Sequence, residues 1–479
     1  MSTRNFEAVI GLEVHVQLKT KSKIFCSDST QYDAADNENT SPVSVGMPGT
    51  LPVVNRKAIE YSIKTGLALN CQIRQRSIFA RKNYFYPDLP KGYQISQYDK
   101  PLCENGSVTF LVDGHEKTVS ITRAHMEEDA GKSIHQSDCT LLNYNRSGIP
   151  LLEIVSGPDM RSPKEAAEYA RTIAQIVQYL DVCDGNLEEG SIRCDCNVSV
   201  RKVGATQLGV KVEIKNINSF RFVEKAIEYE IDRQSDAVER GVDIVQETRL
   251  YDPDKNRTFS MRSKENAQEY RYFPDPDLLP IVVTSELIDK MKAEVPELPL
   301  AKAKRFQTVH GLPEYDCQLL TAESSIADFF EKTVLVSGNP KGSSNWIMTE
   351  LMRELKESKK TIVESPITFQ SLGRLILLID QGIISGKIGK GIFAEMWLSG
   401  KGPDEIIKEK NVEQITDSVA LEGMVDQVLA NNPKEVLEFK AGKVKLMGFF
   451  VGAVMKISKG QASPEQVNKI LNDKLKKTS

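Results

Sequence analysis

The chain has 479 residues, of which 40% are hydrophobic and 27% are charged, with a formal net charge of −4. This composition supports buried cores and excludes a chain that is disordered throughout, and the length fits about three domains. The longest apolar run, residues 446–455, falls far short of the ~20 residues that cross a bilayer. The first residues show no apolar signal segment. We therefore expect no membrane insertion, no export and a cytoplasmic location.

Cysteine usage and local charge give two further indications. The eight cysteines lack the regular spacing of a disulfide framework, which is typical of a reducing compartment. Residues 431–479 carry ten lysines and four acids on an otherwise acidic chain. Such a basic module is compatible with nucleic-acid contact, and a solvated helical surface explains it equally well.

In chain order, the first predicted elements are strands. Residues 11–18 and 192–201 alternate between apolar and polar side chains, the period-two pattern of a half-buried strand. Residues 210–215 repeat this pattern, and the intervening turn at 204–209 predicts a hairpin with the preceding strand. Between the first two strands, Ser162 predicts the start of an amphipathic helix.

The second half of the chain has a different periodicity. After about residue 290 the apolar spacing is close to 3.6, and a Gly/Pro break at 399–403 divides the helical region again. We therefore predict an α+β protein: a β-rich cradle domain with interspersed helices, then an all-α helical domain, then an all-α tail domain. The predicted domains are 1–292, 293–405 and 406–479.

The polar faces of the predicted strands combine carboxylates with histidines. Glu13 and His15 share one face, and His125 and Glu127 have the same spacing. Residues 127–129 are three consecutive acids, whose repulsion is unfavourable without a cation or a basic partner. Carboxylates with an imidazole and no thiolate suit Mg²⁺ or Mn²⁺, although a solvated acidic turn is the alternative. The ligand candidates are Glu13, His15, Glu127, Glu128 and Glu153.

Aromatic and basic residues interleave in two segments, 81–87 and 270–274. Rings beside Arg and Lys are typical of sites that hold single-stranded RNA, but an aromatic core with a basic rim would give the same pattern. A Walker-type phosphate loop is not indicated, because the sequence GKS at 131–133 has Met126 where the first glycine belongs. Any nucleotide must be bound by other means.

Ten stretches spread along the chain form a recognisable set. The first five are IGLEVHVQ at 10–17, RKNYFYPD at 81–88, YQISQ at 93–97, HMEEDAGK at 125–132 and NYNRSGIPLLEIVS at 143–156. The others are EEGSIRCD at 188–195, EIKNINSF at 213–220, YRYFP at 270–274, SNW at 344–346 and KLMGFFVG at 445–452. From about residue 7 to the end, the sequence closely resembles the family of B subunits of bacterial glutamyl/aspartyl-tRNA amidotransferases.

The resemblance implies an activity and a set of site residues. In this family ATP phosphorylates the side-chain carboxylate of glutamate or aspartate on a mischarged tRNA, and ammonia then displaces the phosphate to give Gln-tRNA(Gln) or Asn-tRNA(Asn). The implied metal ligands, for Mg²⁺, are Glu13, His15, Glu128 and Glu153, with Glu127 beside them as a further catalytic residue. The implied phosphate or carboxylate contacts are Lys82, Lys132, Arg193 and Lys215.

The resemblance also implies partners. The sequence lacks a Gly/Ser-rich amidase signature, so ammonia is expected from the glutaminase (A) subunit. The small (C) subunit is expected to complete a heterotrimer, and the tail to contact tRNA. The alternative is a non-catalytic tRNA-binding scaffold of the same complex. A pure scaffold, however, has no need of converging metal ligands.

One segment departs from the family pattern. Some members carry a zinc knuckle near the N-terminus, with Cys-x-Cys followed by Cys-Pro-Val-Cys. The corresponding positions here are Cys26, Asp28, Ser41 and Ser44. One thiolate cannot hold a structural zinc ion, so we expect none.

Overall fold

The alternating segments of the N-terminal region pair into one long sheet. The structure, a computed structural model, describes residues 5–187, 190–263, 270–410, 418–440, 442–458, 462 and 464–477. Glu188 and Glu189, which begin one of the family-like stretches, lie outside the described residues. The chain divides into two units, residues 1–301 and 302–479.

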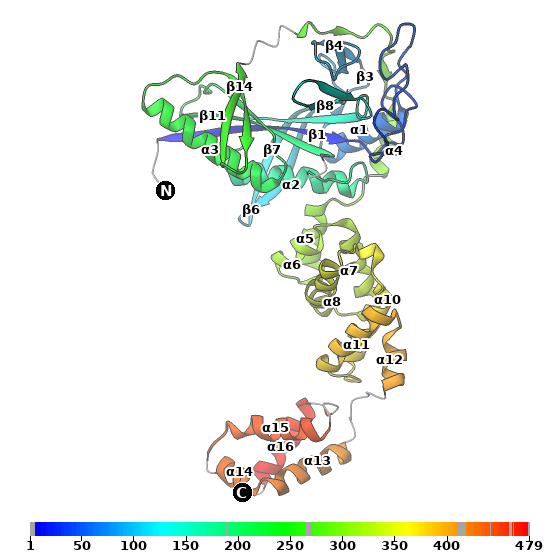
Figure 1. The fold of residues 1–479 in the computed structure, drawn as a ribbon. Coiled ribbons are helices and arrows are strands. Elements are labelled where there is room, and N and C mark those ends of the chain that lie inside the picture. The colour runs from blue at the N-terminus through cyan, green and yellow to red at the C-terminus, as the bar shows by residue number, and fades with distance from the viewer. Residues whose placement is uncertain are drawn as a thin grey trace. The chain divides into compact units, whose positions relative to one another are not determined.

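Nine strands form the main sheet of the first unit, in the order β14-β13-β12-β11-β1-β10-β7-β6-β2 (Figure 1). β12 and β13 are parallel, and the other neighbours are antiparallel. β1 therefore lies in the middle of the sheet although it comes first in the sequence. The strands are β1 (Phe6–Gln17), β2 (Gln72–Ile73), β6 (Cys103–Val112), β7 (His115–Glu128), β10 (Pro150–Ser156), β11 (Ile192–Lys202), β12 (Val212–Lys215), β13 (Glu247–Asp252) and β14 (Arg257–Ser263).

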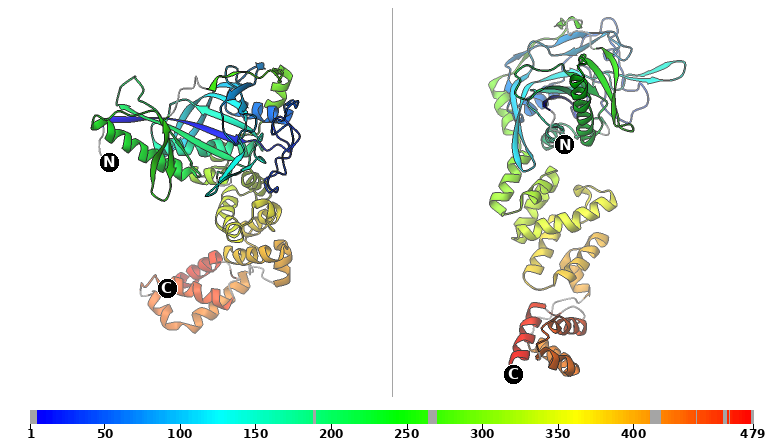
Figure 2. Two further views of the ribbon diagram at one scale, coloured as in Figure 1. Left: turned by 45° about the horizontal axis from the view of Figure 1, so that its top comes forward. Right: turned by 90° about the vertical axis from the view of Figure 1, so that its left-hand side faces the viewer.

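Two long helices cover the apolar face of this sheet. α2 (Pro163–Tyr179) packs on β1 and β6, and α3 (Phe220–Glu239) packs on β11 (Figures 1 and 2). Leu12, Val14 and Val16 of β1 are buried in the core that these helices complete. Because side chains alternate along a strand, the intervening polar residues lie on the opposite face.

The elements predicted in this unit are confirmed. The predicted strand at 11–18 falls largely within β1, and β11 pairs with β12 as the predicted hairpin, with Cys196 opposite Ile214. α2 begins where expected, because the Ser162 hydroxyl accepts a hydrogen bond from the amide of Glu165.

Smaller sheets and two more helices complete the first unit. In the three-stranded sheet β15-β4-β5, Phe273 lies opposite Arg81, so two distant segments of the chain are neighbours. The remaining elements are β4 (Ala80–Asn83), β5 (Tyr93–Ser96) and β15 (Phe273–Pro274); β3 (Arg76–Ser77) paired with β16 (Ile281–Val282); β8 (Lys132–His135) paired with β9 (Thr140–Asn143); and α1 (Arg56–Ala68) and α4 (Ser285–Ala293).

The second unit is helical and contains two apolar clusters. One includes Phe306 and Ile376, and the other includes Val425 and Phe450. The helices from the end of the first unit onward are α5 (Pro299–His310), α6 (Glu314–Leu320), α7 (Ser324–Ser337), α8 (Pro340–Trp346), α9 (Met352–Ser358), α10 (Phe369–Asp380), α11 (Gly386–Ser399), α12 (Pro403–Lys410), α13 (Ser418–Asn431), α14 (Pro433–Lys440), α15 (Leu446–Ile457) and α16 (Pro464–Lys477), with a π-helical turn at Ile347–Leu351 and a 3₁₀ turn at Ile362–Glu364. The predicted α+β class is confirmed, whereas the boundaries at 292 and 405 stay predictions. In the described part of the chain, no helix is long and apolar enough to span a membrane.

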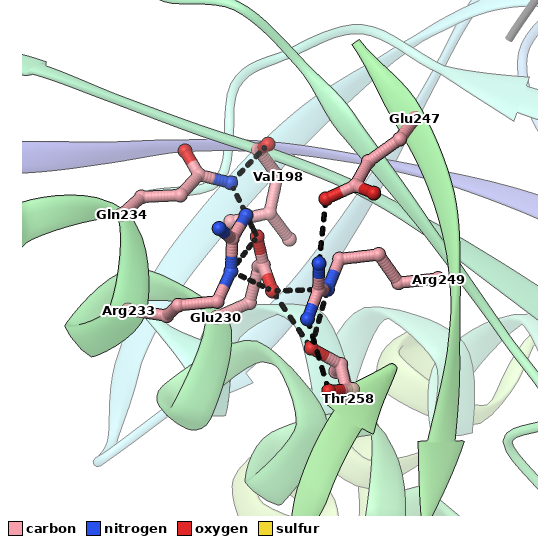
Figure 3. Close-up of polar contacts among 7 residues, drawn as sticks. All are labelled: Val198, Glu230, Arg233, Gln234, Glu247, Arg249 and Thr258. Carbon is pink, nitrogen blue, oxygen red and sulfur yellow. Dashed lines mark hydrogen bonds and ion pairs between the residues drawn. The ribbon is translucent and has the colours of Figure 1, made fainter. Parts of the chain in front are cut away.

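A buried ionic network ties α3 to the edge of the main sheet (Figure 3). Glu230 of α3 is fully buried. Its Oε1 accepts hydrogen bonds from Arg233 Nη2 at 2.5 Å and Gln234 Nε2 at 2.8 Å. Its Oε2 accepts one from Thr258 Oγ1 at 3.1 Å and lies 3.7 Å from Arg249 Nε. One carboxylate thus connects a helix with β13 and β14.

Replacing Glu230 with alanine is expected to destabilise the first unit by roughly 3 kcal/mol, because Arg233 loses its buried counter-charge and Arg249 keeps only its ion pair with Glu247. Urea unfolding, followed by hydrogen exchange in β13 peptides, measures the change. The matched control is Glu228→Ala, an exposed acid on the same helix, which should change the free energy of unfolding by less than about 0.5 kcal/mol. Equal effects of the two substitutions would contradict the structural importance of the network.

Candidate metal and nucleotide site

Strand register brings four ionisable side chains into one row across the polar face of the main sheet. His15 of β1 lies opposite Glu153 of β10 and opposite Arg193 of β11. Glu153 in turn lies opposite His125 of β7. Directly opposed residues on one face of a sheet are close enough to interact, so residues from four strands meet at one place.

His15, Glu127 and Glu153 form the centre of this site, and we call these three residues the central cluster. Nε2 of His15 lies 3.4 Å from Oε2 of Glu153 and 3.6 Å from Oε1 of Glu127. Each of the three residues offers one possible ligand atom, and these atoms all lie within 4.8 Å of one another. In the described part of the chain, this is the group of His, Cys, Asp or Glu side chains that could share one metal ion. Two carboxylates and one imidazole are a donor set suited to Mg²⁺ or Mn²⁺.

Burial makes the charges of the central cluster interdependent. Burial and the neighbouring Glu153 carboxylate raise the pKa of Glu127 to about 7. Burial would also raise the pKa of Glu153, but His125 and His15 hold it well below its usual range. Burial would lower the pKa of His15, but Glu153 and Glu127 raise it to about 9. The cluster therefore carries protons near neutral pH that a divalent cation would displace.

His125 belongs to the site, although sequence reasoning gave it no role beyond its place on a polar strand face. Its Nε2 lies 3.5 Å from Oε2 of Glu153. Burial lowers the pKa of His125 to about 4, so the ring is neutral at physiological pH. Its buried Nδ1 has no hydrogen-bond partner among the residues that the structure describes.

The small β15-β4-β5 sheet carries a lysine, Lys82, whose charge interacts with the central cluster. Nζ of Lys82 lies 4.9 Å from the ring centre of Tyr270 and 5.6 Å from that of Tyr84. Burial would lower the pKa of Lys82, but the charges of Glu127 and Glu153, with the two phenol groups, raise it. A protonated ammonium group next to the cluster can receive a phosphate or a carboxylate.

Two predicted ligands lie outside the central cluster. Glu128 pairs with Lys91, at 2.6 Å between Oε2 and Nζ, and accepts a hydrogen bond from the amide of Ile95 at 2.8 Å. Glu13 is on the same face of β1 as the cluster, and its Oε1 accepts a hydrogen bond from Asn197 Nδ2 at 2.9 Å. The role of both carboxylates as metal ligands stays a prediction.

The predicted phosphate contacts are spread more widely. Arg193, in the row described above, donates from Nη2 to Asp129 at 2.7 Å. Lys215 donates from Nζ to Asp195 on the neighbouring strand. Lys132 is exposed on β8. Of the predicted cations, Lys82 and Arg193 therefore interact with or lie opposite residues of the central cluster, whereas Lys215 is paired with Asp195 and Lys132 is exposed.

Comparison with known proteins gives the family. Residues 8–289, which contain the whole site, match the family described as GatB/GatE catalytic domain, and residues 328–475 match the GatB domain. The chain belongs to the GatB family. The resemblance seen in the ten sequence stretches is thus confirmed.

Relatives of this GatB-family chain are similar along almost their full lengths. The B subunit of the aspartyl/glutamyl-tRNA(Asn/Gln) amidotransferase of Bdellovibrio bacteriovorus is 71% identical over 477 residues, covering 99% of this chain and all of the relative. The proteins of the same name from Thermodesulfovibrio yellowstonii and Geobacter sulfurreducens are 55% and 53% identical. They cover 97% and 98% of this chain, and the matches span 98% and 100% of the relatives.

The positions of the zinc knuckle found in some GatB-family members form a hydrogen-bonded loop here. Oδ2 of Asp28 accepts a hydrogen bond from the amide of Ser41 at 2.9 Å, and the same amide lies 3.0 Å from Oγ of Ser44. Burial raises the pKa of the Cys26 thiol to about 11, which disfavours the thiolate that zinc requires. The absence of structural zinc stays a prediction, which metal analysis of the purified protein would check.

The pKa of His15 predicts a loss of stability at alkaline pH in metal-free buffer. His15 has a folded-state pKa of about 9, above its ordinary 6.5, so its stabilising contribution is complete below 6.5 and is lost as the pH rises to 9. On the acid side two groups of the site oppose each other. His125, with a folded-state pKa of about 4, loses its contribution as the pH falls from 6.5 to 4, whereas Glu127, with a folded-state pKa of about 7 against its ordinary 4.5, gains one over nearly the same range. Urea unfolding between pH 7 and 9 therefore measures the loss that His15 controls.

The variant His15→Gln should show a smaller alkaline loss of unfolding free energy between pH 7 and 9. An alkaline loss as large as that of the wild type would show that another group titrates there.

Proposed function

We propose that this chain is the catalytic subunit of a tRNA-dependent amidotransferase acting on glutamate or aspartate esterified to tRNA. The observation that carries the proposal is the central cluster, where two largely buried carboxylates and an imidazole converge in the region that matches the GatB/GatE catalytic domain. The similar proteins are named as the B subunit of aspartyl/glutamyl-tRNA(Asn/Gln) amidotransferase, which supports the substrate class.

The proposed reaction has two steps. A carboxylate is a poor electrophile, so a side-chain oxygen of the tRNA-bound glutamate or aspartate first attacks the γ-phosphorus of ATP, and ADP leaves. Ammonia then attacks the acyl carbon, loses a proton and displaces phosphate, giving Gln-tRNA(Gln) or Asn-tRNA(Asn). The first step brings two anions together, which requires fixed positive charge at the reaction centre.

The central cluster is the proposed metal site. His15, Glu127 and Glu153 would hold Mg²⁺, and the bound ion would supply charge neutralisation at the γ-phosphate. We retain Glu13 and Glu128 as proposed members of the wider site. Glu13 continues the same face of β1, and Glu128 fixes β5 against β7 through the amide of Ile95.

Lysine and arginine side chains are the proposed anion contacts. Lys82, whose protonated state is favoured by the charges of Glu127 and Glu153, is suited to hold the substrate carboxylate or the γ-phosphate. Arg193, opposite His15, borders the same space. We propose Lys132 and Lys215 as outer contacts for ATP or for the RNA backbone.

The ammonia is proposed to come from another protein chain. The similar proteins are named as the B subunit of their enzyme, so this chain is a component of a multi-subunit complex. We propose the glutaminase (A) subunit and the small (C) subunit as its partners in the cytoplasm. A tRNA-binding scaffold without catalysis is the second candidate. It is disfavoured because His and Glu side chains that converge from three strands have no purpose in a scaffold.

Removing one carboxylate of the central cluster is expected to abolish phosphoryl transfer. The complex of this chain with its partner subunits, glutamyl-tRNA(Gln) and γ-labelled ATP, without an ammonia donor, should transfer label to the tRNA-linked glutamate only with Mg²⁺. Glu127→Gln should reduce the rate at least 100-fold, because charge neutralisation at the γ-phosphate is lost. Glu116→Gln, which replaces an exposed acid on the same strand, is the matched control. Undiminished transfer in Glu127→Gln would favour the scaffold.

Cation binding at the central cluster should release protons. At pH 7.5 a metal ligated by His15 must displace its proton, since the pKa of His15 is about 9. Titration calorimetry with Mn²⁺ in buffers of different ionisation enthalpy measures this release. We expect about one proton for the wild type and a smaller release for His15→Gln. Tight Mn²⁺ binding without proton release would place the cation elsewhere.

A further inference from the structure

Five tyrosine rings form a continuous line beside the central cluster, and we call them the tyrosine line. Tyr84 and Tyr86 follow β4, Tyr98 follows β5, and Tyr270 and Tyr272 precede β15. The ring centres are 6.5 Å apart for Tyr86 and Tyr84, 5.8 Å for Tyr84 and Tyr270, and 6.2 Å for Tyr270 and Tyr272. Tyr272 and Tyr98 are stacked at 4.2 Å. The two aromatic segments of the sequence are therefore one structural feature.

The middle of the tyrosine line reaches the central cluster. The Lys82 ammonium group lies over the rings of Tyr84 and Tyr270. The hydroxyl of Tyr84 lies 3.5 Å from Oε1 of Gln94, whose Nε2 donates a hydrogen bond to the carbonyl of Glu128, the residue after Glu127, at 2.7 Å. The charges of Glu127 and Glu153 also raise the pKa of the Tyr272 phenol, which burial raises already. The rings thus border the place where the chemistry is proposed.

The ends of the tyrosine line reach the surface. Tyr86 is 53% exposed, Tyr98 is 43% exposed, and the neighbouring Phe85 is 95% exposed. Adjacent exposed rings leave apolar surface in water, which marks interaction sites on soluble proteins. A buried aromatic core, the alternative interpretation of these segments, does not account for rings at this exposure.

We propose that the tyrosine line, together with Phe85, stacks the bases of unpaired nucleotides at the 3′ end of the RNA substrate. The inference rests on the proposed function and adds a ligand site to it. With the side-chain carboxylate of the aminoacyl group at the central cluster, the ester bond keeps the terminal ribose close by, and the last bases then lie on the surrounding rings. Stacking on aromatic rings accepts any base, so the rings impose no sequence requirement on the bound end.

The extent and the charge of the tyrosine line favour RNA over the adenine of ATP. A single adenine covers one ring position, whereas exposed rings occur at both ends of the line. Lys82 lies at its middle, and Arg271, between Tyr270 and Tyr272, is exposed. Rings interleaved with cations are the combination that holds a flexible phosphate backbone and its bases.

The test compares two RNAs on the full-length chain in complex with its partner subunits. One is an uncharged intact tRNA, and the other is the same tRNA without its unpaired 3′ nucleotides. The double variant Phe85→Ala/Tyr86→Ala should bind intact tRNA roughly ten-fold or more weakly, because each stacked base contributes substantially to affinity. Its affinity for the shortened tRNA and its KM for ATP should match those of the wild type.

Two controls separate stacking from a general defect. Tyr32→Ala removes another strongly exposed ring, 78% exposed, outside the tyrosine line and should leave both affinities unchanged. Tyr86→Phe keeps the ring, so intact tRNA should bind as tightly as to the wild type.

Three results would overturn the inference. The first is an equal loss of affinity of the double variant for both RNAs, and the second is an unchanged affinity for intact tRNA. The third is a raised KM for ATP as the sole effect, because that result would assign the rings to adenine binding. The proposed function fails separately, because it requires Mg²⁺-dependent phosphoryl transfer by the wild type. A wild-type complex that distinguishes the two RNAs but transfers no phosphate would keep the stacking site and refute the enzyme.

Discussion

The antiparallel pairing of β1 with β10 and β11 is the constraint on which the site depends. This pairing places His15 opposite both Glu153 and Arg193. A shift of one residue would turn His15 towards α2 and α3 and expose Leu12, Val14 and Val16 to the polar side. Burial of these apolar residues therefore fixes the position of the imidazole. Core packing and site assembly have the same physical origin.

Charge compensation differs between the Glu230 network and the central cluster of the first unit. Around Glu230, two arginines, an amide and a hydroxyl satisfy one carboxylate, as burial of a charge requires. In the central cluster, the pKa of Glu127 is about 7 and that of His15 is about 9. Bound protons therefore compensate part of the buried negative charge. The first arrangement is suited to holding elements together, whereas the second is suited to exchanging a proton for a cation.

Local patterns predicted those parts of the fold that depend on local physics. The face of β1 that carries Glu13 and His15, the start of α2 after Ser162 and the β11–β12 hairpin all follow from periodicity, capping and turn residues. The fold class followed from the same periodicity, whereas the family followed from the resemblance of ten sequence stretches to its members. These features need no knowledge of which strands are neighbours.

The parts that could not be predicted depend on long-range register. The role of His125 requires that β7 lies next to β10, and no local pattern gives that order. Glu127 and Glu128 are adjacent in sequence, yet alternation along β7 directs them to different neighbours, and the partner of Glu128, Lys91, could not be inferred from local patterns. The two aromatic segments were visible as patterns, but their union into one line depends on the pairing of β15 with β4.

The central place of β1 has a consequence for how the chain folds as it is synthesised. β1 (Phe6–Gln17) leaves the ribosome first, but its partners β10 (Pro150–Ser156) and β11 (Ile192–Lys202) emerge much later. Until then both edges of an apolar strand lack their native partners, a state prone to mispairing and aggregation. Folding of the first unit must wait for these distant contacts, and such topologies fold slowly. The nascent chain therefore carries β1 as an unpaired strand until β10 and β11 have been synthesised.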